Sequence, residues 1–171
     1  RAEIGGEDHF AVLIGKGAEL EAPLVRLHSQ CITGDVLGSL KCDCGDQLQA
    51  AMRLMAENGG GVLIYLAQEG RDIGLLNKMR AYALQDNGLD TVDANHALGF
   101  DTDERVFLPA ARILDALGIT RLRLITNNPD KISQLEQCGI KVEERVPLVL
   151  ASNPHNEDYL ATKKHRTGHM I

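Results

Sequence analysis

The strongest constraint on the fold is an alternation of strand-like and helix-like segments along the second half of the chain. The run GVLIYLAQ at 61–68 is short, apolar and bounded by glycine, as a buried strand is. From 75 to 88, apolar residues recur at the three- and four-residue spacing of a helix. The same criteria predict, in chain order, a helix at 107–119, a strand at 121–128, a helix at 129–139 and a strand at 141–150.

Signals at the ends of these segments support the assignment. Asn128 followed by Pro129 is typical of a helix start, because asparagine caps the first turn and proline suits the first helical position. Glycines stand where the helices are predicted to stop, in Asn87-Gly88, at Gly118 and at Gly139.

The first half of the chain adds predicted strands at 9–15 and 22–28 and a helix at 46–60. This succession favours a mixed or parallel sheet covered by helices. We therefore expect a single α/β domain over residues 1–171, with a mixed β-sheet flanked by helices. Ligands in such folds bind beyond the carboxyl ends of the strands, where this chain has the loops 69–71 and 126–128.

The net charge is −6, which argues against a general nucleic-acid binder, although a local cluster of Arg and Lys can still hold a small phosphate ligand. No apolar run approaches the roughly 20 residues that span a bilayer, and the first residues are too polar for a secretory leader. We expect a cytoplasmic protein without nucleic-acid or membrane partners. Because residue 1 is Arg rather than Met, we also expect the chain to be trimmed or cut from a longer one.

Three of the four cysteines, Cys31, Cys42 and Cys44, lie within one short segment. In a reducing compartment, cysteines this close indicate a metal or a catalytic site rather than disulfides. Asp43 and Gly45 favour a turn that lets the sulfurs of Cys42 and Cys44 converge, which a straight strand would not allow. Three thiolates without an obvious fourth ligand predict a zinc site near the sheet edge with an open position for water.

Two alternatives remain for this cluster. The zinc can be structural, with a fourth ligand elsewhere such as His28, or the cysteines can be unrelated core residues. Cys138, on the predicted helix at 129–139, is expected to be a small core residue.

Four segments together carry a more specific signal. They are RLHSQCITGDVLGSLKCDCGDQL at 26–48, QEGRDIGLLNKMRAYALQD at 68–86, DTVDANHALGFDTDER at 90–105 and LITNNPDKI at 124–132. In combination they resemble GTP cyclohydrolase II, and the resemblance covers nearly the whole chain.

The resemblance implies a hydrolase acting on cyclic amidine C–N bonds. The family opens the imidazole ring of GTP, releases C8 as formate and removes pyrophosphate. The product is 2,5-diamino-6-hydroxy-4-(5-phosphoribosylamino)pyrimidine, and the reaction is the first step of riboflavin biosynthesis. The family also uses one Zn²⁺ per subunit and Mg²⁺ with the triphosphate, and it forms homodimers.

The resemblance assigns the zinc to Cys31, Cys42 and Cys44, with a water in the fourth position. It implies GTP contacts at Arg26, Leu27, His28, Ser29, Gln30, Gln47, Glu69, Gly70, Arg71, Thr91, Thr126 and Lys131. The Glu69 carboxylate suits the N1–H and 2-amino group of guanine. Lys131 near a helix start suits a phosphate.

The implied catalytic residues are Tyr82, Asp103 and Arg105. Tyr82 corresponds to a tyrosine beside the guanine ring, although a helical tyrosine is as readily a core aromatic. Asp103 and Arg105 correspond to a proton acceptor and a nucleophile toward the α-phosphorus. An electrostatic role for Arg105 is comparably weighted, because a guanidinium stays protonated. A plain surface ion pair is the third possibility.

Two positions depart from the family pattern. Gln30 stands where relatives often have Glu. Lys41 stands where an Arg commonly precedes the second cysteine, so the compact ammonium charge of a lysine replaces the planar, forked guanidinium of an arginine. The departures keep open a non-catalytic GTP-binding zinc protein on the same scaffold. A further alternative is a family member that retains the formyl group. His96, His165 and His169 are left unassigned.

Overall fold

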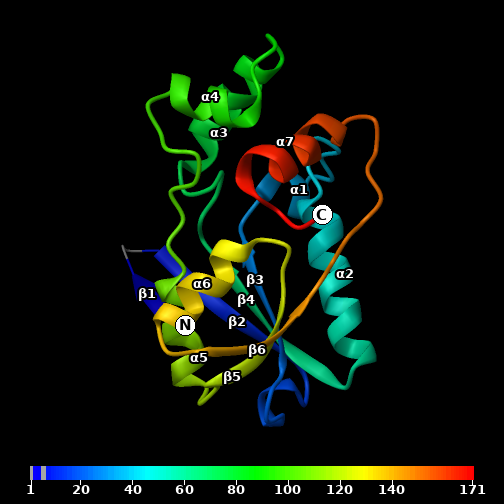
Figure 1. Cartoon of the computed structure of the whole chain (residues 1–171), viewed down its shortest axis with the longest axis vertical. Coiled ribbons are helices and arrows are strands. Elements are labelled where there is room, and N and C mark those ends of the chain that lie inside the picture. Colours follow the sequence, from blue (N-terminus) through cyan, green and yellow to red (C-terminus); the bar gives the residue numbers. More distant parts are fainter. Residues whose placement is uncertain (1, 5–6) are drawn as a thin grey trace.

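A mixed β-sheet forms the centre of the structure, and helices cover both of its faces (Figure 1). The computed structural model describes residues 2–4 and 7–171. The strands are β1 (Ala2–Ile4), β2 (Glu7–Gly15), β3 (Leu24–Ser29), β4 (Gly60–Leu66), β5 (Arg121–Ile125) and β6 (Lys141–Val146). Their order across the sheet is β1-β2-β4-β3-β5-β6.

Strands β3 to β6 all run in the same direction. β3 pairs in parallel with β4 on one side and with β5 on the other, and β6 is parallel to β5. β2 is antiparallel to β4, and β1 to β2. The carboxyl ends of the central strands therefore meet at one edge of the sheet, which is where parallel folds place ligand sites.

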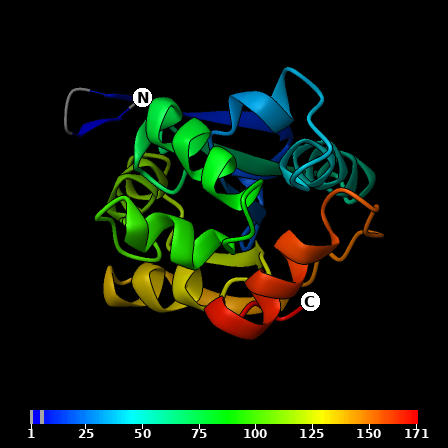
Figure 2. The ribbon, with the colours of Figure 1, turned by 90° about the horizontal axis from the view of Figure 1, so that it is seen from above.

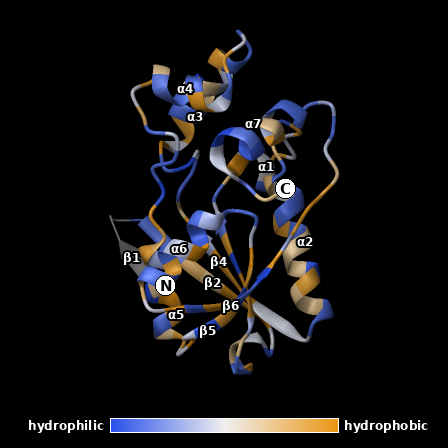
Figure 3. Cartoon of the chain, in the orientation of Figure 1, coloured by the Kyte–Doolittle hydropathy of each residue, from blue (hydrophilic) through white to orange (hydrophobic). Residues whose placement is uncertain are grey.

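Alternate residues of the central strands face two separate cores. Val25, Leu27, Val62 and Ile64 pack against α5 (Leu108–Ala116) and α6 (Pro129–Gln137). Their neighbours Leu24 and Leu63 face the opposite side, where α2 (Cys44–Glu57) contributes Ala51 and Met55. Strands buried on both faces read as continuous apolar runs, as 61–66 does. Figure 3 shows the apolar residues concentrated along these strands.

The remaining helices lie beyond the carboxyl edge of the sheet. They are α1 (Ile32–Asp35), α3 (Gly74–Gln85), α4 (Thr91–Ala97) and α7 (Glu157–Thr167), and a short 3-10 turn, η1 (Gly17–Glu19), follows β2. Seen from above, α3 and α4 stand on one side of this edge and α7 on another (Figure 2). Among the described residues, no helix is long and apolar enough to cross a membrane.

The predicted α/β class and the flanked mixed sheet are confirmed, and each strand and helix predicted above has a counterpart in the structure. Asn128 caps α6 as predicted, because its side chain accepts from the Asp130 backbone N–H, with Pro129 in the first turn. The strand predicted at 141–150 ends earlier, at Val146. Helices α1, α4 and α7 were not predicted.

The expectation that Cys138 is a core residue is wrong. Cys138 follows the last turn of α6 and its side chain is exposed, while Leu135 of the same helix is buried in the core. Cys138 is the C-cap residue, one position beyond the last helical residue Gln137, so it lies where α6 ends rather than on the buried face that carries Leu135.

Candidate functional site

A cavity opens where β3, β4 and β5 end. Its walls are the loops after these strands, the start of α2, helix α3 and the C-terminal helix α7. All of the predicted site residues line it except Leu27 and Asp103. Leu27 alternates with Arg26 and His28 along β3, so its side chain lies in the core, and only its carbonyl faces the site as the acceptor for Lys131.

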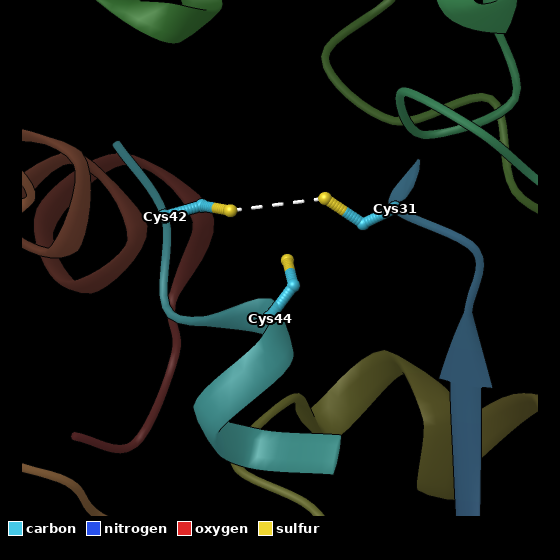
Figure 4. A group of neighbouring side chains, drawn as sticks. All are labelled: Cys31, Cys42 and Cys44. Atoms are coloured by element: carbon cyan, nitrogen blue, oxygen red, sulfur yellow. Dashed lines mark hydrogen bonds between the residues drawn. The ribbon is translucent and has the colours of Figure 1, made fainter. Parts of the chain in front are cut away.

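Three sulfur atoms converge at one end of this cavity (Figure 4). Cys31 follows β3, Cys42 lies in the loop before α2, and Cys44 is the first residue of that helix. The sulfurs lie within 4.8 Å of one another, and Cys31 Sγ is 3.7 Å from Cys42 Sγ. Two sulfurs bound tetrahedrally to one zinc at 2.3 Å are about 3.8 Å apart. The Cys31–Cys42 separation therefore matches two ligands of one zinc ion, and the Cys44 sulfur lies close enough to be the third.

Glycines allow the segments to approach so closely. A Cβ at Gly34 would lie 3.0 Å from Cys42 Sγ and 3.3 Å from Cys31 Sγ. A Cβ at Gly45 would lie 2.2 Å from the Gly34 carbonyl oxygen. The turn expected around Asp43 takes the form of a helix start, which brings Cys42 and Cys44 to the same side.

Among the described residues, no histidine, aspartate or glutamate joins the three thiols in this cluster. His28, the alternative fourth ligand, instead donates from Nε2 to Asp35 Oδ1 at 2.9 Å. Its Nδ1 is buried without a partner, and burial lowers the pKa of the imidazole. The arrangement leaves one side of the cluster free of protein ligands, as a catalytic zinc site requires.

Lys78, which sequence reasoning missed, lies directly beside the cluster. Its Nζ donates to Cys31 Sγ at 3.1 Å, to Thr33 Oγ1 at 2.8 Å and to Glu69 Oε1 at 2.8 Å. Burial lowers its pKa, but the bonds to Glu69 and Cys31 outweigh burial and raise the pKa, so Lys78 is a cation. The available signal was its position four residues before Tyr82, on the same face of α3.

The Glu69 side chain is largely occupied by the protein itself. Oε2 accepts from the Ile32 backbone N–H at 2.7 Å, and Oε1 accepts from Gly70 N–H at 3.0 Å as well as from Lys78. The loop then passes through three successive left-handed residues, with φ of 65° at Gly70, 60° at Arg71 and 76° at Asp72. Non-glycine residues in this region cost about 1 kcal/mol or more each, and such strain gathers at functional loops.

Arginine and lysine side chains face the same cavity despite the acidic net charge. Arg26 is bonded to the Ile125 carbonyl (3.1 Å) and to Gln47, and burial lowers its pKa to about 10. Lys131 donates to the Leu27 carbonyl (2.7 Å). Burial, and then Arg26 among its neighbours, lowers the pKa of Lys131 well below its ordinary value.

Arg105 lines the cavity and forms a bidentate pair with Asp103, which does not line it. Arg105 Nε donates to Asp103 Oδ1 at 2.7 Å and NH2 donates to Oδ2 at 2.5 Å, while NH1 reaches Ser29 Oγ at 3.2 Å. Burial raises the pKa of Asp103, but the Arg105 guanidinium outweighs it and the pKa is lowered. The Arg105 side chain is 11% exposed and lines the cavity, unlike a solvated surface pair.

Tyr82 lines the cavity rather than the core, and burial raises the pKa of its phenol. Two ammonium groups lie near the ring, Lys41 Nζ at 5.1 Å and Lys78 Nζ at 5.7 Å from its centroid. Lys41 is half-exposed and pairs with Asp86 at 2.5 Å, outside the main cavity. Lys41, which stands where the family commonly has an arginine, therefore borders the Tyr82 ring and does not line the main cavity.

The C-terminal segment contributes cavity residues that are not among the predicted site residues. Tyr159 and Lys163 of α7, together with His169, line the cavity. His169, which the sequence pattern does not assign, is partly buried here. The other two unassigned histidines, His96 and His165, are exposed and do not line the cavity.

Comparison with known proteins gives consistent matches. The sequence model of a family described as GTP cyclohydrolase II matches residues 1–147. A GTP cyclohydrolase-2 of Azospirillum brasilense is 58% identical over 98% of this chain, which spans 43% of that protein's length. Proteins of the same name from Shigella boydii and Cronobacter sakazakii are 54% and 55% identical over 97% of the chain, which spans 85% and 84% of their lengths.

Proposed function

The chain belongs to the GTP cyclohydrolase II family, and from this premise we propose that it opens the imidazole ring of GTP. The proposed reaction releases formate and pyrophosphate and leaves the diaminopyrimidine that begins riboflavin synthesis. One observation carries the proposal: three cysteine sulfurs spaced for a single zinc ion, with a side free of protein ligands, at the wall of a cation-lined cavity.

Cys31, Cys42 and Cys44 are the residues that would hold the zinc. A zinc ion with three protein ligands supplies an acidic water at neutral pH, with a pKa of about 7. Lys78 donates to the Cys31 sulfur and so offsets part of the negative charge of three thiolates. A donor of this kind also fixes the orientation of the ligand.

Tyr82 and Glu69 are the proposed contacts to the base. The raised pKa of Tyr82 keeps its phenol protonated, so that it can donate a hydrogen bond to the purine or to a water. A carboxylate has about four acceptor positions, and three on Glu69 are filled by Lys78, Ile32 and Gly70. One position is left for guanine, which suits a single specific contact.

Arg71, Arg105 and Lys131 are the proposed contacts to the triphosphate, with Mg²⁺ as the expected counter-ion. We favour Arg105 as an electrostatic clamp on the transferring phosphoryl group over a nucleophile. Asp103 engages both Nε and NH2 of the guanidinium, and a carboxylate with a lowered pKa is a weak base for removing a guanidinium proton.

The test is incubation with GTP, Zn²⁺ and Mg²⁺, followed by purine absorbance and by assays of formate and pyrophosphate. The wild type should change the purine band and release both products. Cys42→Ser should lose zinc and ring opening, and Arg105→Ala should keep zinc but lose turnover. GTP binding without absorbance change would favour the non-catalytic zinc protein, and a changed band without formate would favour retention of the formyl group.

We also propose a homodimer in the cytoplasm, as the family resemblance implies. We propose that Leu37 and Leu76, large apolar side chains that are 72% and 65% exposed in the isolated chain, belong to the interface. Sedimentation velocity at micromolar concentration measures the state, and a mass near 18.6 kDa would contradict the dimer.

A further inference from the structure

Polar contacts, rather than an apolar face, hold helix α7 at the cavity. None of its residues is fully buried. Arg166 NH1 bonds to Asp90 and, at 2.9 Å, to Asp93 Oδ1, both at the start of α4. Beyond the helix, the Met170 backbone N–H donates to the Asn127 carbonyl at 2.8 Å. These two attachments fix α7 between α4 and the loop after β5, across the cavity.

Lys163 is the cation on the cavity side of this helix. Its side chain is 13% exposed, and it lines the cavity with Tyr159, one turn earlier. Nζ donates to Asp43 Oδ1 at 2.7 Å and lies 4.5 Å from the Tyr159 ring centroid. An ammonium has three N–H groups, and Asp43 is its one hydrogen-bond acceptor among residues 2–4 and 7–171. The remaining donors are available to a ligand.

Other cations face the same space, and together they act on the neighbouring His169. The pKa of His169 is lowered to about 4 by burial and then, in order, by Lys163, Arg71, Arg105 and Lys131. Asp43 pairs with Lys163 and Asp103 with Arg105, which leaves Arg71 and Lys131, of these four, without a paired carboxylate among the described residues. An anion with several charged oxygens would relieve the repulsion and accept from several donors at once.

The geometry points to Lys163 as a further substrate-binding residue, which donates to a phosphate group of the nucleotide. The inference rests on the proposed function for the identity of that nucleotide. It adds a C-terminal helix to a phosphate site otherwise built from the loop after β4, the segment between α4 and α5, and α6. The competing role is structural: Lys163 would hold Asp43, and through it the loop that carries Cys42 and Cys44.

Calorimetric titration of the zinc-loaded protein with inorganic triphosphate separates these roles. Lys163→Met should bind triphosphate about tenfold more weakly, because one charge-assisted contact is lost. Lys164→Met, an exposed lysine on the same helix, should bind like the wild type. Asp43→Asn should bind as tightly as the wild type or tighter, since it frees the ammonium. Guanosine, which has no phosphate, should bind all of the variants equally.

Two results would overturn the inference. One is a triphosphate affinity in Lys163→Met equal to that of the wild type. The other is a loss of triphosphate affinity in Asp43→Asn as large as the loss in Lys163→Met, because that result indicates the structural role. If Lys163→Met does not fold, the double variant Asp43→Asn with Lys163→Gln is used instead. It removes both charges of the ion pair, so neither is left buried without its partner. Compared with Asp43→Asn alone, the double variant must bind triphosphate more weakly for the inference to hold.

Formate release from GTP is measured on the wild type in parallel. Binding of triphosphate through Lys163 without formate release would retain the inference and remove the proposed function. Formate release together with triphosphate binding that is unchanged by Lys163→Met would retain the proposed function and remove the inference.

Discussion

A glycine, which has no side chain, decides whether the cysteine cluster can form. Gly34 packs against all three cysteines, with Cys44 Cβ also only 3.1 Å from the position of a Cβ at Gly34. Contacts this short are rarely tolerated at a side chain in a packed interior. The metal site therefore depends on a small residue in α1 as much as on its ligands.

We predict that Gly34→Ala weakens zinc binding by about tenfold or more, because the added methyl group pushes the sulfurs apart. Competition with a chromophoric chelator measures the affinity. Val36→Ala, at a 67% exposed position just after α1, is the matched control and should bind zinc normally. Unchanged affinity in Gly34→Ala would show that the cluster tolerates the displacement.

Lys78 is the cation that contacts both the Cys31 sulfur and the Glu69 carboxylate beside the cluster. Lys78→Met should lower the free energy of unfolding by roughly 3 kcal/mol, because Glu69 loses its ion pair in a site where both side chains are 10% exposed. Urea denaturation of the zinc-loaded protein measures the change. Arg80→Met, an exposed cation on the same helix, should have almost no effect. Equal losses in the two variants would contradict the role assigned to the buried pair.

At the scale of elements, local sequence signals are sufficient to predict a helix or strand wherever the segment includes the residues that start or stop it. Asn128 and Pro129 correctly predict the start of α6. Gly118 and Gly139 adopt the left-handed conformation just after α5 and α6, as predicted for helix ends. Helix α4 was missed because it has only seven residues, although Asp90 caps it. Helix α7 was missed because its polar sequence offers no apolar stripe; its place depends on Arg166 and other contacts distant along the chain.

The cap of α6 links an element boundary to the site, because Lys131 lies in the first turn of that helix. Asn128→Ala should lower the free energy of unfolding by about 1 kcal/mol, since the Asp130 backbone N–H loses its acceptor. It should also weaken triphosphate binding by disordering that turn. Asn128→Asp, which retains a capping oxygen, should preserve stability in thermal or urea unfolding. A stable Asn128→Ala variant would mean that proline alone sets the helix start.

At the scale of the whole molecule, the site assembles segments that no local pattern relates. The sequence motif brought Cys31, Cys42 and Cys44 together, because they lie within one segment. The bond from Lys78 to Cys31 and the pair of Lys163 with Asp43 span 47 and 120 residues. Contacts over such separations follow from sheet topology and helix docking, which a single sequence does not display.

The charge gathered around the cavity has a consequence for stability in acid. His169, with its pKa lowered to about 4, stays neutral in the folded protein, whereas in the unfolded chain it protonates near pH 6.5. Between these values the unfolded state binds more protons, so the free energy of unfolding falls as pH falls from 6.5 to 4 and is unaffected by this group above 6.5. The loss should reach up to about 3 kcal/mol, because each pKa unit is worth 1.36 kcal/mol.

Urea unfolding of the wild type and His169→Gln across this pH range isolates the contribution. The variant should lose less stability on acidification, while His165→Gln, at an exposed position on α7, should follow the wild type. Carboxylates with lowered pKa values, such as Asp103, also destabilise the fold at the acid end of this window, but they do so in the wild type and the variant alike, so the difference between the two curves reports His169. Parallel curves for wild type and His169→Gln would mean that His169 leaves the cationic cavity and titrates in solvent.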